Sequence, residues 1–219
     1  MKTEKYLKAG YFTDSNHPDL KAFAGKYYRR EDTPVQRAVK LYYAVRDGFF
    51  YNPYCLHLDK ERIKASRLIN KAQGYCVEKA IILTAACRSA GISARLGFGI
   101  VKNHIGTERL ERFLKTNLLV FHGYSELWLG NAWVKATPAF NKALCDKLGV
   151  PPLEFDGKTD SLLQEYDRRG ARYMEYMHIY GSFHDLPYDL FVSELKKYYG
   201  ELFESQYYDP AENMVCFTD

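Results

Sequence analysis

The spacing of apolar residues predicts helices in the first part of the chain. Apolar residues recur at helical spacing after Thr33-Pro34, and Asn16-His17-Pro18 has the pattern of a capped helix start with proline in the first turn. Residues 75–90, YCVEKAIILTAACRSA, are apolar on most faces, and Gly91 after them is typical of a helix stop. We therefore expect one helix buried at the centre of the core.

Strands are predicted directly after this helix. Residues 92–102, ISARLGFGIVK, read as a strand whose glycines permit close approach of another backbone. Residues 117–129 and 132–137, joined by Gly130-Asn131, predict a β-hairpin. A central helix followed by consecutive strands predicts an α+β fold. With no repeat or linker in 219 residues, we expect a single domain over 1–219.

Composition narrows the function classes. The net charge of +4 is too small to indicate a nucleic-acid partner. No segment has the pattern of a signal peptide or a membrane span, so no membrane partner is expected. Five cysteines, an odd count without a CxxC pair, predict reduced thiols and a cytoplasmic location. The 19 tyrosines are expected to line a groove or the edge of the core.

Cys76 is the first candidate for chemistry, because it falls in the first turn of the central helix. Unpaired N–H groups and the positive end of the helix dipole favour a thiolate there, and a nearby imidazolium favours it further. The thiolate is the nucleophilic form of cysteine. Cys87 is expected to be core, and Cys55, beside His57, to be structural. A buried inert cysteine would also fit this helix position, so Cys76 needs a partner.

His122 is that partner candidate, on the first strand of the hairpin. With Gly130-Asn131 at the turn, counting back along both strands places Thr137 opposite Tyr124, on the face of His122. Such diagonal neighbours are about 7–8 Å apart, which an imidazole and a short side chain can bridge. We therefore expect Thr137 to orient His122.

Glu126 shares the face of His122 but lies four residues along the strand, a distance of about 13 Å. We expect it to support the rim of the site or to form a salt bridge. A lone strand histidine is more often structural, so the argument for a site depends on Cys76, His122 and Thr137 together.

These segments resemble the transglutaminase-like superfamily, which includes transglutaminases and bacterial cysteine-protease homologues with a papain-like fold. The family pattern has Gly-x-Cys opening a helix, here residues 74–76, and a Cys/Ala-Arg-x-x-Gly-Ile-x-Ala-Arg stretch, here residues 87–95. Its His-x-aromatic-x-Glu strand is residues 122–126, followed by a turn and Trp133. The resemblance covers roughly residues 72–141, with additional helices expected on both sides of this core.

The resemblance implies amide or acyl-transfer chemistry. Cys76 would attack a peptide or protein amide, or a small amide, and His122 would manage the proton while a thioester forms. No cofactor and no metal are implied. The family's Asp is replaced by Thr137, whose hydroxyl is expected to fix the orientation of His122, with Asn141 as a substitute. The second oxyanion donor, beside the N–H of Cys76, is sought among Gln73, Tyr51 and Asn52.

Two other functions remain as alternatives. A non-catalytic module could keep this fold and bind peptides in a tyrosine-rich groove, and Thr137 in place of Asp favours it. A metal site from His104, His122, His178 and His184 lacks ligand spacing.

Overall fold

The computed structural model describes residues 3–105 and 108–217. Its helices are η1 (Glu4–Leu7), α1 (Pro18–Gly25), α2 (Pro34–Gly48), α3 (Ala65–Leu68), α4 (Cys76–Ser89), α5 (Glu108–Leu114), α6 (Lys142–Leu148), α7 (Tyr188–Tyr198) and α8 (Gly200–Phe203). Its strands are β1 (Phe50–Tyr51), β2 (Cys55–His57), β3 (Gln73–Gly74), β4 (Ala94–Asn103), β5 (Leu118–Leu129), β6 (Ala132–Ala136), β7 (Met174–Phe183), β8 (Tyr208–Asp209) and β9 (Met214–Cys216). None of the helices in these two ranges is both long and apolar enough to cross a membrane.

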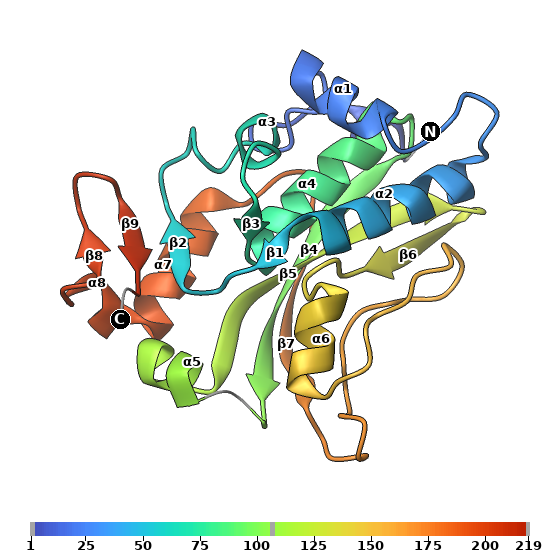
Figure 1. Cartoon of the computed structure of the whole chain (residues 1–219). Coiled ribbons are helices and arrows are strands. Elements are labelled where there is room, and N and C mark those ends of the chain that lie inside the picture. Colours follow the sequence, from blue (N-terminus) through green and yellow to red (C-terminus); the bar gives the residue numbers. More distant parts are fainter. Residues whose placement is uncertain (1–2, 106–107, 218–219) are drawn as a thin grey trace.

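A four-stranded antiparallel sheet in the order β6-β5-β4-β7 organises the fold. Helix α4 packs on this sheet, and α1, α2 and α3 pack on α4 (Figure 1). Two small sheets, β2-β9-β8 and the parallel pair β1-β3, lie beside this core. The predicted α+β fold with a central helix on an antiparallel sheet is therefore confirmed.

Helix α4 is buried from its first residue, Cys76, to Arg88. Charged side chains on so buried a helix need partners. Lys79 is fully buried, and its ammonium donates to three backbone carbonyl oxygens, those of Arg46 (2.9 Å), Phe49 (2.8 Å) and Ala139 (2.7 Å). Lys79 thus joins the end of α2 and the segment after β6 to the first turns of α4.

The hairpin has the predicted register. Leu129 pairs with Ala132, and the turn residues Gly130 and Asn131 have φ values of 55° and 74°. Both positions of this two-residue turn require positive φ, which the Gly-Asn sequence accepts. The ladder ends where Ser125 pairs with Ala136.

The predicted close approach of another backbone is found at Gly99, where a Cβ atom would lie 2.6 Å from the carbonyl oxygen of His178. A Cβ atom on Gly97 would lie 2.2 Å from the ring of Tyr124, and one on Gly99 would lie 2.8 Å from the ring of Tyr176. These two tyrosine rings therefore lie directly against the backbone of β4.

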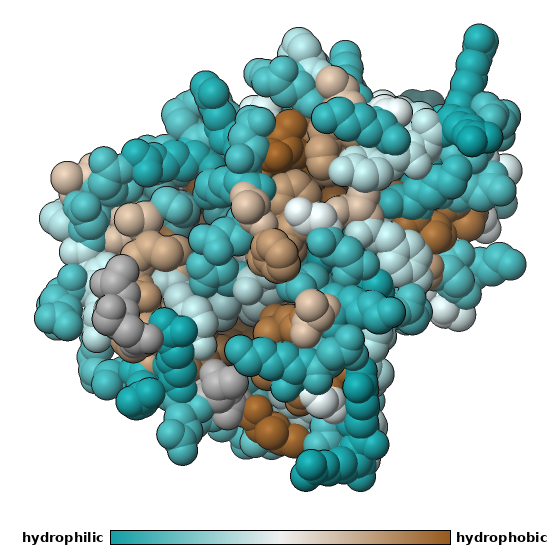
Figure 2. Space-filling view, in the orientation of Figure 1, coloured by the Kyte–Doolittle hydropathy of each residue, from teal (hydrophilic) through white to brown (hydrophobic). Residues whose placement is uncertain are grey.

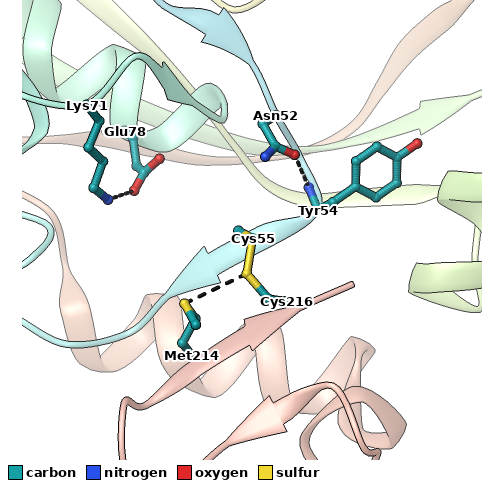
Figure 3. Close-up of a disulfide and its surroundings, with 7 residues drawn as sticks. All are labelled: Asn52, Tyr54, Cys55, Lys71, Glu78, Met214 and Cys216. Atoms are coloured by element: carbon teal, nitrogen blue, oxygen red, sulfur yellow. Dashed lines mark hydrogen bonds and ion pairs between the residues drawn. A yellow bond between two sulfur atoms is a disulfide. The ribbon is translucent and has the colours of Figure 1, made fainter. Parts of the chain in front are cut away.

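Cys55 of β2 and Cys216 of β9 form a disulfide (Figure 3). The prediction of reduced thiols is wrong for this pair, and with it goes the basis for expecting a cytoplasmic location. The two cysteines are 161 residues apart in sequence and meet because β2 pairs with β9. Cys76, Cys87 and Cys145 are free and buried.

Candidate active site

Cys76 is the first residue of α4, as predicted, and is 7% exposed. Tyr75 before it is extended, and its N–H donates to Glu78 Oε2 at 3.3 Å, which satisfies one free N–H of the helix start. A Cβ atom on Gly74 would lie 3.0 Å from the same carboxylate oxygen. The sequence Gly-Tyr-Cys-x-Glu therefore fixes where the helix begins and where the thiol lies.

Burial dominates the acidity of this thiol. It raises the pKa of Cys76 to about 11, although the N–H groups of Gly123 and Val77, its own N–H and the Tyr51 hydroxyl lower it. The expected donors at the helix start are therefore present, but removal from solvent disfavours the thiolate more. The expected effect of the helix start on the thiol is therefore present, but burial outweighs it and keeps the pKa of Cys76 above its ordinary value.

Gly123 links Cys76 to the neighbourhood of His122. A Cβ atom on Gly123 would lie 3.0 Å from Val77 Cα, so only glycine lets β5 pass this close to the first turn of α4. Because β6 pairs with β5 only as far as Ser125, the N–H of Gly123 is available to the thiol. His122 is therefore the chain neighbour of the residue that lies against the start of α4.

The His122 ring is 2% exposed and forms a hydrogen bond of 3.3 Å between its Nδ1 and the Tyr176 hydroxyl. Tyr176 comes from β7, and its ring lies over Gly99, the residue that pairs with His122. Burial lowers the pKa of His122 to about 4, so the ring is neutral at pH 7. In the part of the chain that the structure describes, no hydrogen bond joins this ring to Cys76 Sγ. The site therefore holds a neutral thiol and a neutral imidazole instead of the expected ion pair.

An irregularity in β5 directly precedes His122. The β4–β5 register shifts between Gly99 and Val101, and Phe121 has a φ of 61°. Positive φ is uncommon for a residue with a bulky side chain and is maintained by its surroundings. Here the Phe121 ring stacks on Phe98 with centroids 4.6 Å apart. This bulge lies just before His122 and so sets the direction in which the His122 side chain points from the strand.

Thr137 has other partners than the hairpin pattern predicted. Its hydroxyl donates to Leu162 O at 2.7 Å, and its carbonyl accepts a 3.1 Å hydrogen bond from the Tyr42 hydroxyl. These bonds hold the chain where it turns away from β6. The side chain at His122 Nδ1 is Tyr176, from a strand that the sequence patterns did not connect to the site.

Asn141 supports the site through Tyr51 and not through His122. Its Oδ1 accepts the N–H of Tyr51 at 3.1 Å, and the Tyr51 hydroxyl contacts the Cys76 thiol. Of the three oxyanion candidates, Tyr51 is the one that the structure brings to the thiol.

The other two oxyanion candidates, Gln73 and Asn52, line a different cavity from the one that contains Cys76. Asn52 Oδ1 accepts the N–H of Tyr54 at 3.0 Å, which fixes a local turn (Figure 3). The Gln73 side chain is exposed. The structure therefore does not bring these two side chains to the Cys76 thiol.

Tyr75 is a residue that sequence reasoning missed. It lines the same cavity as Cys76, and its buried hydroxyl has no hydrogen-bond partner within the described ranges. An unpaired buried hydroxyl costs about 1–3 kcal/mol, so such a group marks a place where a ligand can bond. Its position directly before Cys76 was the available signal.

Glu126 forms the expected salt bridge. It pairs with Arg95 at 2.5 Å and accepts a 2.8 Å hydrogen bond from Ser182 Oγ. Elsewhere His104 pairs with Glu175 at 2.8 Å. Over residues 3–105 and 108–217, no group of three or more His, Cys, Asp or Glu side chains is placed to hold a metal ion.

Sequence comparison defines the class of protein. The model of the transglutaminase-like superfamily matches residues 21–138, more than half of the chain. The chain belongs to the transglutaminase-like superfamily. This membership supports a cysteine-dependent enzyme as its general class.

Among solved structures, the chain is similar to a "Putative Cysteine Protease from Cytophaga hutchinsonii", with 17% sequence identity and a TM-score of 0.46. The similarity covers 61% of this chain and 40% of that chain, so it spans less than half of the other protein. No curated protein matches.

Proposed function

We propose that the protein is a cysteine-dependent acyl-transfer enzyme in which Cys76 is the nucleophile and His122 the base. The single observation that carries this proposal is the close packing of β5 on the start of α4: a Cβ atom on Gly123, the residue after His122, would lie 3.0 Å from the Cα of Val77, the residue after Cys76. Membership of the transglutaminase-like superfamily supports the same residue roles.

Because the Cys76 thiol and the His122 ring are both neutral, the proposed reaction includes a proton transfer from one to the other. Cys76 Sγ attacks the carbonyl carbon of a peptide, protein or small amide, and its proton passes to His122 as the C–S bond forms. His122 then gives this proton to the departing amine, the C–N bond breaks and a thioester remains. Water or an amine attacks the thioester, which releases an acid or a new amide and restores the thiol.

Three groups are available for the negative charge that develops on the carbonyl oxygen. The N–H groups of Cys76 and Gly123 and the hydroxyl of Tyr51 already contact the sulfur. Donors fixed in a water-poor site stabilise such an oxyanion most effectively. The closed, largely apolar surroundings of Cys76 fit this mechanism.

The test is acyl capture at Cys76. An activated ester is mixed with the protein, and the acylated residue is located by mass spectrometry in wild type, Cys76→Ala and His122→Gln. Acylation confined to Cys76, absent in Cys76→Ala and slowed at least 100-fold in His122→Gln, is the expected result. Cys87→Ala and Cys145→Ala are matched controls, since both remove a free buried thiol elsewhere. Labelling that survives Cys76→Ala refutes the proposal.

The burial of both groups favours a second function, a non-catalytic module that binds peptides. A buried neutral thiol with a pKa of about 11 is a poor nucleophile until a substrate or a movement changes its surroundings. Iodoacetamide labelling of Cys76 across pH separates the two. A rate that rises only above pH 8 and is the same in His122→Gln supports the binding module, and a rate that depends on His122 supports the enzyme.

A further inference from the structure

Two cavities adjoin at the candidate nucleophile. The inner one, of about 40 Å³, is lined by Cys76 and Tyr75, and the outer one, of about 110 Å³, reaches α5 and α6. Tyr51, Pro53 and Leu119 line both. These shared walls place the two cavities side by side, and together they are called the path from Cys76 to α5 and α6.

The path is apolar along its length. Leu114, Val120 and Leu195 line its inner part, and Leu110, Leu144 and Leu148 its outer part. None of the described residues that line either cavity carries a charge. In Figure 2, apolar atoms show among hydrophilic ones between the places that α5 and α6 occupy in Figure 1.

Two tyrosines of the inner cavity differ in whether their hydroxyl groups have partners. The Tyr199 hydroxyl donates to Leu118 O at 2.8 Å and accepts the N–H of Val120 at 2.7 Å, so backbone groups occupy it. The Tyr75 hydroxyl is buried and has no partner within residues 3–105 and 108–217. The path thus combines uncharged, largely apolar walls with the unpaired Tyr75 hydroxyl, which lines the same cavity as Cys76.

The geometry points to an acyl-binding site: the two adjoining cavities take the uncharged, apolar acyl part of the substrate, and the Tyr75 hydroxyl donates to its carbonyl oxygen. This inference rests on the proposed function, because it assigns the acyl group that Cys76 would carry. Two arguments identify the occupant of the path. The path begins at Cys76, so the group that enters it is the acyl group bonded to Cys76. A charged group would lose its hydration there without gaining a partner, so the acyl group is uncharged.

Acyl chain length tests the apolar part. A series of p-nitrophenyl esters from acetyl to octanoyl is used, with acyl-Cys76 formation followed by intact mass. Each methylene buried is expected to raise kcat/KM about fourfold until the path is filled, from about 0.8 kcal/mol per methylene.

Two variants on α6 locate the path. Leu144→Arg, which puts a charge on the outer wall, should remove the gain in kcat/KM that long acyl chains give. Leu144→Ala should move the optimum to a longer chain. Ala143→Arg is the matched control, because this exposed neighbour lines neither cavity, and it should keep the wild-type profile.

Tyr75→Phe tests the polar end and keeps the ring. It should lower kcat about 10- to 100-fold for every ester and leave the dependence on chain length unchanged, since the carbonyl oxygen is common to all. A wild-type rate for Tyr75→Phe overturns the role of the hydroxyl.

Failure of this inference differs from failure of the proposed function. A flat chain-length profile with normal acylation of Cys76 overturns the apolar site and leaves the enzyme. If no ester acylates Cys76, the melting temperature of the Cys76→Ala protein is measured with and without octanamide to detect binding. A rise that Leu144→Arg abolishes supports the apolar site without the enzyme, and no rise overturns both.

Discussion

Replacing Lys79 with methionine tests whether its buried ammonium holds the site together. Lys79 donates to the carbonyl oxygens of Arg46, Phe49 and Ala139, and the three N–H bonds of an ammonium match these three acceptors. Arg46 and Phe49 lie at the end of α2, where helical carbonyls lack intrahelical partners. Lys79→Met therefore leaves three buried carbonyl groups without this donor.

Two opposing contributions determine how much stability Lys79→Met loses. Three carbonyls left unpaired cost about 1–3 kcal/mol each, whereas methionine no longer has to be desolvated as a charge. We expect Lys79→Met to lower the free energy of unfolding by about 3–5 kcal/mol at pH 7, a large part of the total for a domain. Lys40→Met is the matched control, because Lys40 is 42% exposed and its pair with Asp32 is worth less than about 1 kcal/mol.

The pH dependence of the free energy of unfolding gives a second test of Lys79. Burial lowers the pKa of Lys79 from 10.5 to about 7. The unfolded chain then binds the extra proton between about pH 7 and 10.5, so Lys79 makes the protein more stable as pH rises through that window. The stability difference between wild type and Lys79→Met should grow by about 3 kcal/mol from pH 7 to 9.

Urea unfolding followed by circular dichroism at pH 7, 8 and 9 measures both effects. A loss below 1 kcal/mol at pH 7, or a wild-type-minus-variant difference that is flat with pH, would refute the reasoning about Lys79.

Three further predictions use the same unfolding assay. Gly123→Ala should cost about 1–3 kcal/mol and abolish acylation, because its Cβ would meet Val77 Cα at 3.0 Å; Gly48→Ala, whose Cβ would meet nothing within 4 Å, is the control, and equal effects of the two would contradict the contact. Burial lowers the pKa of His122 to about 4 from 6.5, so the unfolded chain takes up the proton first and about 3 kcal/mol of stability should be lost as pH falls from 6.5 to 4. His122→Gln should lose less over that range, and an unchanged slope would count against the buried neutral ring. Reduction of Cys55–Cys216, or Cys216→Ser, should cost about 2–5 kcal/mol, because the bond closes a loop of 161 residues; identical midpoints with and without reductant would contradict this.

Local patterns were sufficient to predict the centre of the fold. The apolar run after Gly74 gave the position of α4, and Gly130-Asn131 gave the register of the hairpin down to Leu129 opposite Ala132. Both are decided by residues close in sequence, through helix-start chemistry and turn conformation. The close approach at Gly97 and Gly99 likewise follows from the glycines themselves.

The surroundings of the site depend on contacts between distant segments, which such patterns do not contain. Tyr176 reaches His122 from β7, 54 residues later, and Thr137 is turned toward Leu162 by the chain after β6. The acidity of Cys76 has the same origin: the N–H groups of the helix start are local, but the burial that outweighs them comes from residues on other elements, such as Tyr51, Leu119 and Tyr199. The disulfide was missed for the same reason, since only the pairing of β2 with β9 brings its cysteines together.

The Cys55–Cys216 bond also makes the chain a covalent ring from residue 55 to residue 216. Cys76, Tyr75, His122 and Tyr176 all lie inside that ring. A protease that cuts once in any loop between them therefore cannot release a fragment while the bond is intact. The nicked protein should migrate as one piece on a denaturing gel without reductant and as two pieces after reduction, with both halves of the site still held together in the first case.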